Sequence, residues 1–196
     1  LEKRELTLEQ QESVKAELAQ DYFKAGLYGR SEELLLSLNK EKYYQFSLST
    51  LLEIYVKERE WEKAIEKATE LEKVSGVSFR ISISHYLCEI AVNQILNKKY
   101  TSAKKILNKA LEESKNCIRA NILLGDIYAE EKLYEEAIVY WKKIEFQKPE
   151  YLGLVAPKII STLQVTGKIN EGLSILARFF DLYKLKTLLN VLYEGV

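Results

Sequence analysis

The sequence predicts an all-α fold, a right-handed solenoid of about five antiparallel helix pairs followed by one terminal helix. Three observations support this prediction. Small and aromatic residues recur together at a period of roughly 34 residues, the length of one helix-pair repeat. Only two prolines and eight glycines occur in 196 residues, so long stretches can be helical. Charged residues make up 30% of the chain, and many Glu residues flank Lys at helical spacing. Such an array buries a core by stacking each helix pair on its neighbours.

The clearest unit lies between Asn121 and Pro149. Gly125 and Ala137 are small, as two antiparallel helices require where they cross closely. Trp141 fills space beside that crossing, and the proline ends the second helix because it has no amide hydrogen to donate. This unit matches the tetratricopeptide pattern W-x₂-L-G-x₂-Y, A-x₃-F and P, with asparagine in the tryptophan place. The matched positions are Asn121, Leu124, Gly125, Tyr128, Ala137, Trp141 and Pro149.

Four further units precede or follow this one. Tyr22 and Tyr55 occupy equivalent positions one period apart, whereas the next equivalent, Gln94, comes several positions later than the period requires. The extra residues fall in the β-branched, serine-rich segment Val74–Ser84, which in isolation resembles a strand. We expect a loop there that runs into a lengthened first helix of the third unit. The predicted units of this single array are approximately residues 12–44, 45–78, 84–117, 118–151 and 153–182, and residues 183–196 begin a further unit.

Local signals mark both ends of the array. Thr7 can cap the first helix, and Gln10, three residues later, can complete a capping box. Gly26 is placed to end that helix before a short turn. The segment Tyr183–Val196 has the apolar spacing of another first helix but no partner after it, so we expect self-association through this helix. Because the sequence has no Met, we also expect that it is a piece of a longer protein with more repeats.

Composition excludes several classes of partner. Lys+Arg and Asp+Glu are 29 each, which gives a formal net charge of +0. Nucleic acids and anionic lipids require clustered positive charge, so neither is expected as the main partner. Tyrosines recur at two repeat positions, as packing residues do, without the interleaved basic residues that base stacking needs. No apolar run reaches the roughly 20 residues of a membrane-spanning helix. The recurring tyrosines are Tyr22, Tyr55 and Tyr128, and Tyr28, Tyr100 and Tyr134.

No catalytic or metal-binding signature is apparent. The chain has one histidine, His85, and two cysteines, Cys88 and Cys117, which form no CxxC pair. His85 and Cys88 are three residues apart on one helix face, but two ligands are too few for a structural zinc site. Cys88 and Cys117 lie in different parts of a repeat and give no basis for a disulfide, so we expect free, buried thiols. Adjacent acids such as Glu135 and Glu136 are expected on solvated helix faces. We therefore predict no enzyme activity and no cofactor.

The remaining candidate site is the concave groove lined by the first helix of each pair. The repeat register places both charged and apolar side chains on it, which suits a folded protein or an amphipathic segment. The Lys and Asn clamp with which some tetratricopeptide domains hold a chaperone's C-terminal carboxylate is absent. The predicted groove residues are Gln20, Phe23, Lys24, Glu53, Val56, Lys57, His85, Cys88, Val92, Ile95, Arg119, Ile122, Asp126 and Glu130.

The order of features resembles the cytoplasmic repeat region of the lipopolysaccharide assembly protein B (LapB) family. The residues that carry this resemblance are LTLEQQ at Leu6–Gln11, DYFKAGLYGRSEELL at Asp21–Leu35, EIYVKEREWEKAIEKA at Glu53–Ala68 and HYLCEIA at His85–Ala91. The likeness spans roughly positions 6 to 150, and the insertion between the second and third units falls where that family has one.

The resemblance implies a specific role. Family members are inner-membrane proteins of Gram-negative bacteria with an N-terminal anchor, cytoplasmic repeats and a C-terminal rubredoxin-like metal site. They restrain lipopolysaccharide synthesis by helping the membrane protease FtsH degrade the deacetylase LpxC. The chain would be the cytoplasmic middle of such a protein, a non-enzymatic adaptor with LpxC and FtsH as partners. The alternative is a tetratricopeptide scaffold of another bacterial assembly system, such as secretion or pilus assembly.

Overall fold

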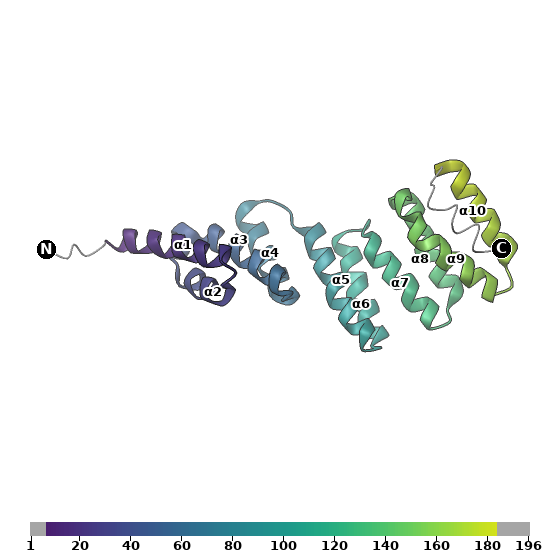
Figure 1. The fold of residues 1–196 in the computed structure, drawn as a ribbon, viewed down its shortest axis with the longest axis horizontal. Helices are drawn as coiled ribbons and strands as arrows, with labels where there is room; N and C mark the ends of the chain where they lie inside the picture. Colours follow the sequence, from purple (N-terminus) through teal and green to yellow (C-terminus); the bar gives the residue numbers. More distant parts are fainter. Residues whose placement is uncertain (1–6, 184–196) are drawn as a thin grey trace. The chain divides into compact units, whose positions relative to one another are not determined.

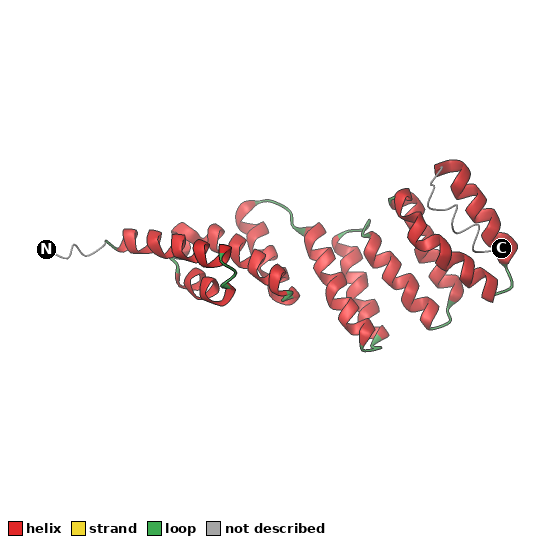
Figure 2. Cartoon of the chain, in the orientation of Figure 1, coloured by secondary structure: helices red, strands yellow, loops and turns green. Residues whose placement is uncertain are grey.

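A computed structural model describes residues 7–183, in which helices are joined by short loops (Figures 1 and 2). It contains ten α-helices, one short 3₁₀ turn and no strand. The predicted all-α class is confirmed. The helices are α1 (Leu8–Lys24), α2 (Tyr28–Ser37), α3 (Lys40–Glu58), α4 (Trp61–Ser75), α5 (Arg80–Leu96), α6 (Tyr100–Glu113), α7 (Ile118–Glu130), α8 (Tyr134–Gln147), α9 (Leu152–Val165) and α10 (Ile169–Tyr183), with η1 (Pro149–Tyr151) between α8 and α9.

Two predicted helix boundaries are confirmed. The Thr7 side chain accepts a hydrogen bond from the Gln10 amide at 3.3 Å, and the Gln10 side chain accepts one from the Thr7 amide at 2.9 Å. This is the capping box. Gly26, with φ +76°, follows α1 in the left-handed region that an L side chain adopts only at a cost. Its backbone reverses the chain so that α2 begins at Tyr28.

The strand-like segment Val74–Ser84 divides as expected. α4 ends at Ser75, and α5 begins at Arg80, so most of the β-branched residues of the segment belong to helices. Ser75 helps to shape the turn, because its hydroxyl donates to the Leu71 carbonyl at 2.7 Å and accepts from the Val77 amide at 3.2 Å. The Phe79 amide also donates to the Glu72 carboxylate at 3.1 Å, so local hydrogen bonds from two side chains of α4 shape the turn.

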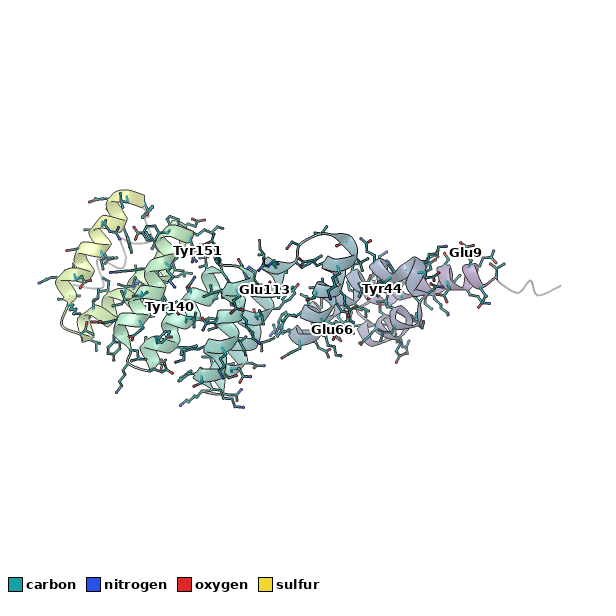
Figure 3. The ribbon with its side chains drawn as sticks, turned by 180° about the vertical axis from the view of Figure 1, so that it is seen from behind. Glu9, Tyr44, Glu66, Glu113, Tyr140 and Tyr151 are labelled. Carbon is teal, nitrogen blue, oxygen red and sulfur yellow. The ribbon has the colours of Figure 1, made fainter. Side chains whose placement is uncertain are left out.

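The chain divides into two compact units, residues 1–86 (unit 1) and 87–196 (unit 2). In unit 1, α1 packs on α2 and α3 packs on α4. Ser31 takes the small position of its pair, and its buried hydroxyl donates to the Ala19 carbonyl at 2.8 Å. Tyr44 on α3, labelled in Figure 3, donates its hydroxyl to Glu70 on α4 at 3.1 Å. Hydrogen bonds thus accompany apolar packing between the helices of each pair.

Unit 2 has two clusters of buried apolar side chains. One joins the end of α5 to α6 and α7, and the other joins α8, α9 and α10. Between α7 and α8, a Cβ at Gly125 would lie 2.8 Å from the Cε2 atom of Trp141, so the glycine is required by the indole. Ala137 is fully buried beside the same crossing. The predicted reason for the two small residues is confirmed.

The predicted terminal helix lies outside the described residues, and so does its apolar face of Leu185, Leu188, Leu189 and Leu192. Self-association through that helix therefore stays a prediction. The limits of the repeats and their union in one array also stay predictions. Among residues 7–183, no helix is both long and apolar enough to cross a membrane.

Candidate functional site: the groove of unit 2

Two open hollows lie on unit 2, and α7 contributes to both. We call them together the unit 2 groove. The α5–α7 hollow has a volume of about 380 Å³ and the α7–α9 hollow about 340 Å³. Asp126 and Glu130 line both hollows. The α5–α7 hollow is completed by Ile95, Leu96, Lys98, Tyr100, Leu123 and Ile127, and the α7–α9 hollow by Ala129, Trp141, Lys158, Ser161 and Thr162.

The α5–α7 hollow combines an apolar wall with charges at its edge. Leu96 is 75% exposed at the end of α5, a high value for a leucine in a folded domain. Ile95 and Leu123 are half-buried beside it. Lys98 and Glu130 are exposed and bring opposite charges to the rim. The hollow can therefore accept an apolar side chain while leaving neighbouring polar groups of a ligand in water.

The α7–α9 hollow is organised around Asp126. Lys158 donates to both carboxylate oxygens of Asp126 at 2.6 Å, and the Trp141 indole Nε1 donates to one of them at 3.1 Å. The same indole nitrogen lies 3.3 Å from the Ile122 carbonyl oxygen. Gly125 permits this arrangement, because the indole rests where a side chain at that position would be. The result is a charged, hydrogen-bonded group held in a fixed position on the groove.

Sequence reasoning placed Asp126 on the groove but missed its partner Lys158. The available signal was the spacing, because Lys158 follows Asp126 by 32 residues, close to one repeat. Three other ion pairs within one unit join residues 33 apart, and they recur because equivalent helices of successive pairs lie side by side. These pairs are Lys42–Glu9, Lys168–Glu135 and Arg178–Glu145. Glu135 is 83% exposed, in keeping with the solvated face expected for it.

The other predicted groove residues of unit 2 differ in accessibility. Val92 and Ile122 are half-buried, and Arg119 is exposed and forms an ion pair with Glu89 of α5. Cys88 is fully buried. Its prediction as a groove-lining residue is wrong, since the side chain points into the core between α5, α6 and α7 and offers no surface to a ligand.

In unit 1, the structure brings together two of the predicted groove residues. Phe23 on α1 and Lys57 on α3 meet, with the lysine Nζ 5.8 Å from the centre of the phenyl ring. Gln20 and Val56 are half-buried, whereas Lys24 and Glu53 are exposed. His85, near the end of this unit, is also exposed.

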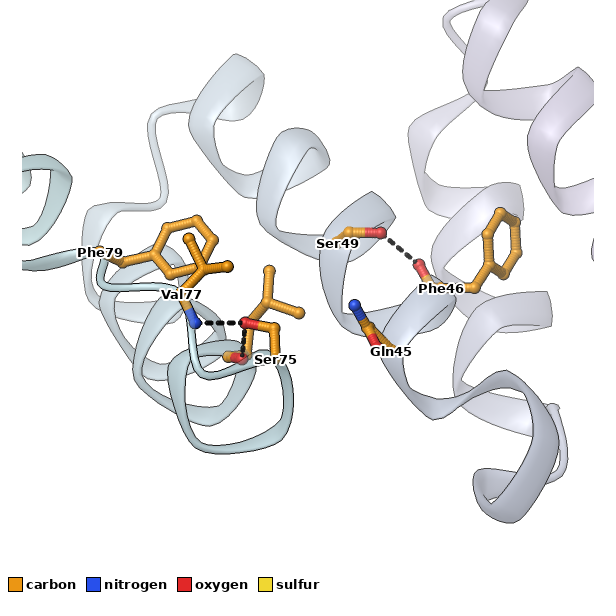
Figure 4. Close-up of a pocket in the computed structure, with 7 residues that line it drawn as sticks. Gln45, Phe46, Ser49, Ser75, Val77 and Phe79 are labelled. Carbon is orange, nitrogen blue, oxygen red and sulfur yellow. Dashed lines mark hydrogen bonds between the residues drawn. The ribbon is translucent and has the colours of Figure 1, made fainter.

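Unit 1 also has a hollow that the sequence did not indicate. It lies between α3, the end of α4 and the turn that follows (Figure 4), and its volume is about 410 Å³. Phe46, Leu71, Val77 and Phe79 give it an apolar wall, and its polar residues are Gln45, Ser49 and Ser75. The extra residues of Val74–Ser84 form part of this wall, which explains why the regular repeat pattern did not reveal it.

The site residues offer little chemistry of their own. Among the described residues, no three His, Cys, Asp or Glu side chains are grouped so as to hold a metal ion. Cys88 hydrogen-bonds with Cys117 and is buried, and both effects raise the pKa of its thiol. The Cys88 thiol is therefore protonated in the folded chain.

Comparison with known proteins finds sequence relatives that share the same name. The chain is 30% identical over 179 residues to lipopolysaccharide assembly protein B of Escherichia coli strain K12, and the match covers 91% of the chain and 46% of the relative. It is 30% identical over 148 residues to the Haemophilus influenzae protein of the same name, covering 75% and 37%. The chain thus spans about half the length of the curated relatives it matches. No family model matches the chain.

Solved structures with the same fold include tetratricopeptide proteins. One titled "Crystal structure of MamA protein" superposes with a TM-score of 0.53 at 14% identity, over 87% of this chain and 90% of that one. Another, YrrB, is titled "a TPR protein with an unusual peptide-binding site" and has a TM-score of 0.51 at 15% identity, over 92% and 89%. At these identities the likeness concerns the fold alone, and it confirms the predicted tetratricopeptide class.

Proposed function

Because this chain is homologous to a region of the lipopolysaccharide assembly protein B family, we propose that it is a protein-binding adaptor that acts in lipopolysaccharide assembly. The observation that carries this proposal is the unit 2 groove, where two open hollows share Asp126 and Glu130. Grooves of this kind recognise a segment through a few anchoring side chains set among polar contacts. The adaptor binds its partners without modifying them.

The groove favours an amphipathic partner segment. An aliphatic side chain in the α5–α7 hollow would cover Leu96, which is 75% exposed in the chain alone. A lysine or arginine next to it would meet Glu130 on the rim. Asp126 is already paired with Lys158, so it adds fixed polar groups to the groove rather than an uncompensated charge. Because Lys98 lies on the same rim, the occupant is an apolar segment with charged neighbours of both signs.

The partners we propose are the deacetylase LpxC and the membrane protease FtsH. In this proposal the adaptor holds LpxC close to FtsH and so promotes its degradation, on the cytoplasmic side of the inner membrane. Holding a substrate near a protease raises its effective concentration there, even when each contact alone is weak. The proposal requires that the chain bind at least one of the two proteins.

The test is a binding titration of the purified chain with LpxC and, separately, with the cytoplasmic part of FtsH. Leu96→Glu places a charge in the α5–α7 hollow, and Glu130→Lys reverses the charge of its rim. Each variant is expected to weaken binding at least tenfold, with unchanged helical content. Both positions are exposed, so the fold should tolerate them.

Val139→Glu is the matched control. Val139 is 57% exposed on α8 and lines neither hollow of the groove. It should bind as the unsubstituted chain does. Equal weakening by Val139→Glu and Leu96→Glu would place the binding surface elsewhere. Failure of the chain to bind either protein would remove them as partners and favour a scaffold of another bacterial assembly system.

A further inference from the structure

The two cysteines of the chain meet inside unit 2. Cys88 on α5 and Cys117 at the start of α7 have their sulfur atoms 3.7 Å apart, although 29 residues separate them in sequence. Neither is in a disulfide, and both are buried, with exposures of 0% and 4%. The sequence led us to expect free, buried thiols, and this is confirmed. Their proximity was not foreseen, because it depends on how α5 packs beside α7.

We propose that Cys88 and Cys117 form a site of reversible oxidation, in which a disulfide joins α5 to the N-terminal end of α7. A disulfide requires its sulfur atoms about 2.05 Å apart, so they must approach by about 1.7 Å. Small rotations about the Cα–Cβ bonds and a slight shift of the α6–α7 turn supply a movement of this size.

The surroundings favour a disulfide over a metal ion as the product. The core around the two sulfurs is made of apolar side chains, among them Ala91, Leu107 and Leu124. A disulfide is neutral and loses nothing by burial there, whereas two thiolates around a monovalent metal ion would carry a net negative charge at a desolvation cost. Among the described residues, no third ligand joins them to form a metal site.

The positions of the two thiols indicate which reacts first. Cys117 is the N-cap residue of α7. The partial positive charge of a helix N-terminus stabilises an anionic sulfur. Cys117 also directly follows two exposed turn residues, Lys115 and Asn116, so it lies nearer the surface than Cys88 does. Cys88 lies deeper in the core and reacts second.

The reaction balances with hydrogen peroxide as the oxidant. The Cys117 thiolate attacks one peroxide oxygen and breaks the O–O bond; the hydroxide released takes up the proton the thiol had lost and leaves as water. The resulting sulfenic acid is then attacked by the Cys88 sulfur, which forms the S–S bond. The Cys88 proton and the sulfenic hydroxyl leave as a second water molecule. In total, two thiols lose two hydrogen atoms, and one peroxide is reduced to two waters.

Oxidation would act on the groove through the same two helices. Glu89 and Arg119, each one or two residues from a cysteine, form an ion pair between α5 and α7. Ile95 of α5 and Leu123 of α7 both line the α5–α7 hollow. A covalent bond between the helices would fix the spacing of these walls. Only this consequence rests on the proposed binding function; the oxidation site itself does not.

The experiment treats the whole chain with hydrogen peroxide at neutral pH and then counts free thiols and maps peptides without reduction. We expect the loss of both thiols, one intramolecular Cys88–Cys117 link, and recovery of both thiols with dithiothreitol. The melting temperature of the oxidised chain should rise by several degrees, because the link restricts the unfolded state.

Single variants complete the test. Cys117→Ser and Cys88→Ala each leave one thiol, so neither should gain thermal stability after peroxide. Two thiols that stay free after prolonged treatment would overturn the proposal. Sulfonic acids or intermolecular links in place of the internal bond would overturn it as well. Because the thiol count is made on the unsubstituted chain, a variant that fails to fold does not obscure the result.

Discussion

At the scale of single residues, Gly125 and Trp141 are sterically coupled where α7 and α8 meet. A Cβ at position 125 would meet the indole, and the indole donates to Asp126 in the groove. We therefore predict that Gly125→Ala lowers the free energy of unfolding by about 1–3 kcal/mol through overpacking. Urea unfolding measures this loss, and an unchanged midpoint would contradict the close approach of α7 and α8.

The double variant isolates the contact. In a Trp141→Leu background the indole is gone, so Gly125→Ala should cost clearly less than it does in the unsubstituted chain. Equal costs in both backgrounds would mean that the alanine acts on α7 alone. The same contact explains why the residue types at positions 125 and 141 could be predicted from the sequence. A small residue opposite a large aromatic residue is a steric requirement on two positions, so both residue types can be recognised in the sequence.

For other residues, the sequence contains no such pair of complementary positions. Asn121, in the tryptophan place of the pattern, is 1% exposed, and its side-chain nitrogen donates to the Cys117 carbonyl oxygen at 3.3 Å. Cys88 was placed on the groove because its position in the repeat register is near that face, yet it lies in the core. A register fixes the face only to within about one residue, because each residue turns the helix by about 100°. The register therefore cannot decide whether a residue at the edge of the groove face is exposed or buried.

At the scale of elements, the turns within helix pairs share one backbone shape. A residue with positive φ precedes the second helix of each pair, and this residue is glycine in only two of the five turns. Only Gly26 was predicted, because glycine is visible in the sequence and the backbone angle of a lysine or arginine is not. The five residues are Gly26, Arg59, Lys98, Lys132 and Gly167.

Two neighbouring glycines allow a direct test of this turn. A new Cβ at Gly26 or at Gly29 meets no atom within 4 Å, so packing plays no part at either site. Gly26→Ala should destabilise the chain by about 1 kcal/mol, because alanine is strained at φ +76°. Gly29→Ala, inside α2, should stabilise it by up to about 0.5 kcal/mol. Melting curves that shift in the same direction for both variants would contradict the assigned backbone conformations.

The ion pairs between equivalent helices also differ in how deeply their carboxylates are buried. Arg178 on α10 donates to Glu145 on α8 at 2.8 Å, and the glutamate side chain is 3% exposed. Removing the arginine leaves a buried carboxylate without its cation, so Arg178→Ala should cost about 1–3 kcal/mol in urea unfolding. Lys168→Ala breaks a pair with the same sequence spacing, but Glu135 is 83% exposed.

The lysine variant is the control for this prediction. Exposed ion pairs contribute little, because water and salt screen them. Lys168→Ala should therefore unfold at nearly the same urea concentration as the unsubstituted chain. Similar losses for the two variants would show that burial of Glu145 does not set the strength of its pair.

At the scale of the whole molecule, the repeat pattern was sufficient for the fold class, whereas the groove as a binding site stays a prediction. Asp126, Glu130 and Ile95 were assigned to the groove from register alone, and all three line its hollows. The hollow of unit 1 could not be predicted, since its wall comes from the irregular turn after α4. The pairing of Cys88 with Cys117 could not be predicted either, because contacts between successive pairs depend on packing distances that a period does not contain.

The central claim is that partner proteins bind the unit 2 groove, and hydrogen–deuterium exchange tests it most directly. Exchange of backbone amides is compared in the chain alone and in the chain saturated with LpxC or with the cytoplasmic part of FtsH. We predict slower exchange at the ends of α5 and α7 and along the face of α9, around Leu96, Glu130 and Lys158. Protection confined to α6, α8 and α10, or no protection by either protein, would contradict the claim.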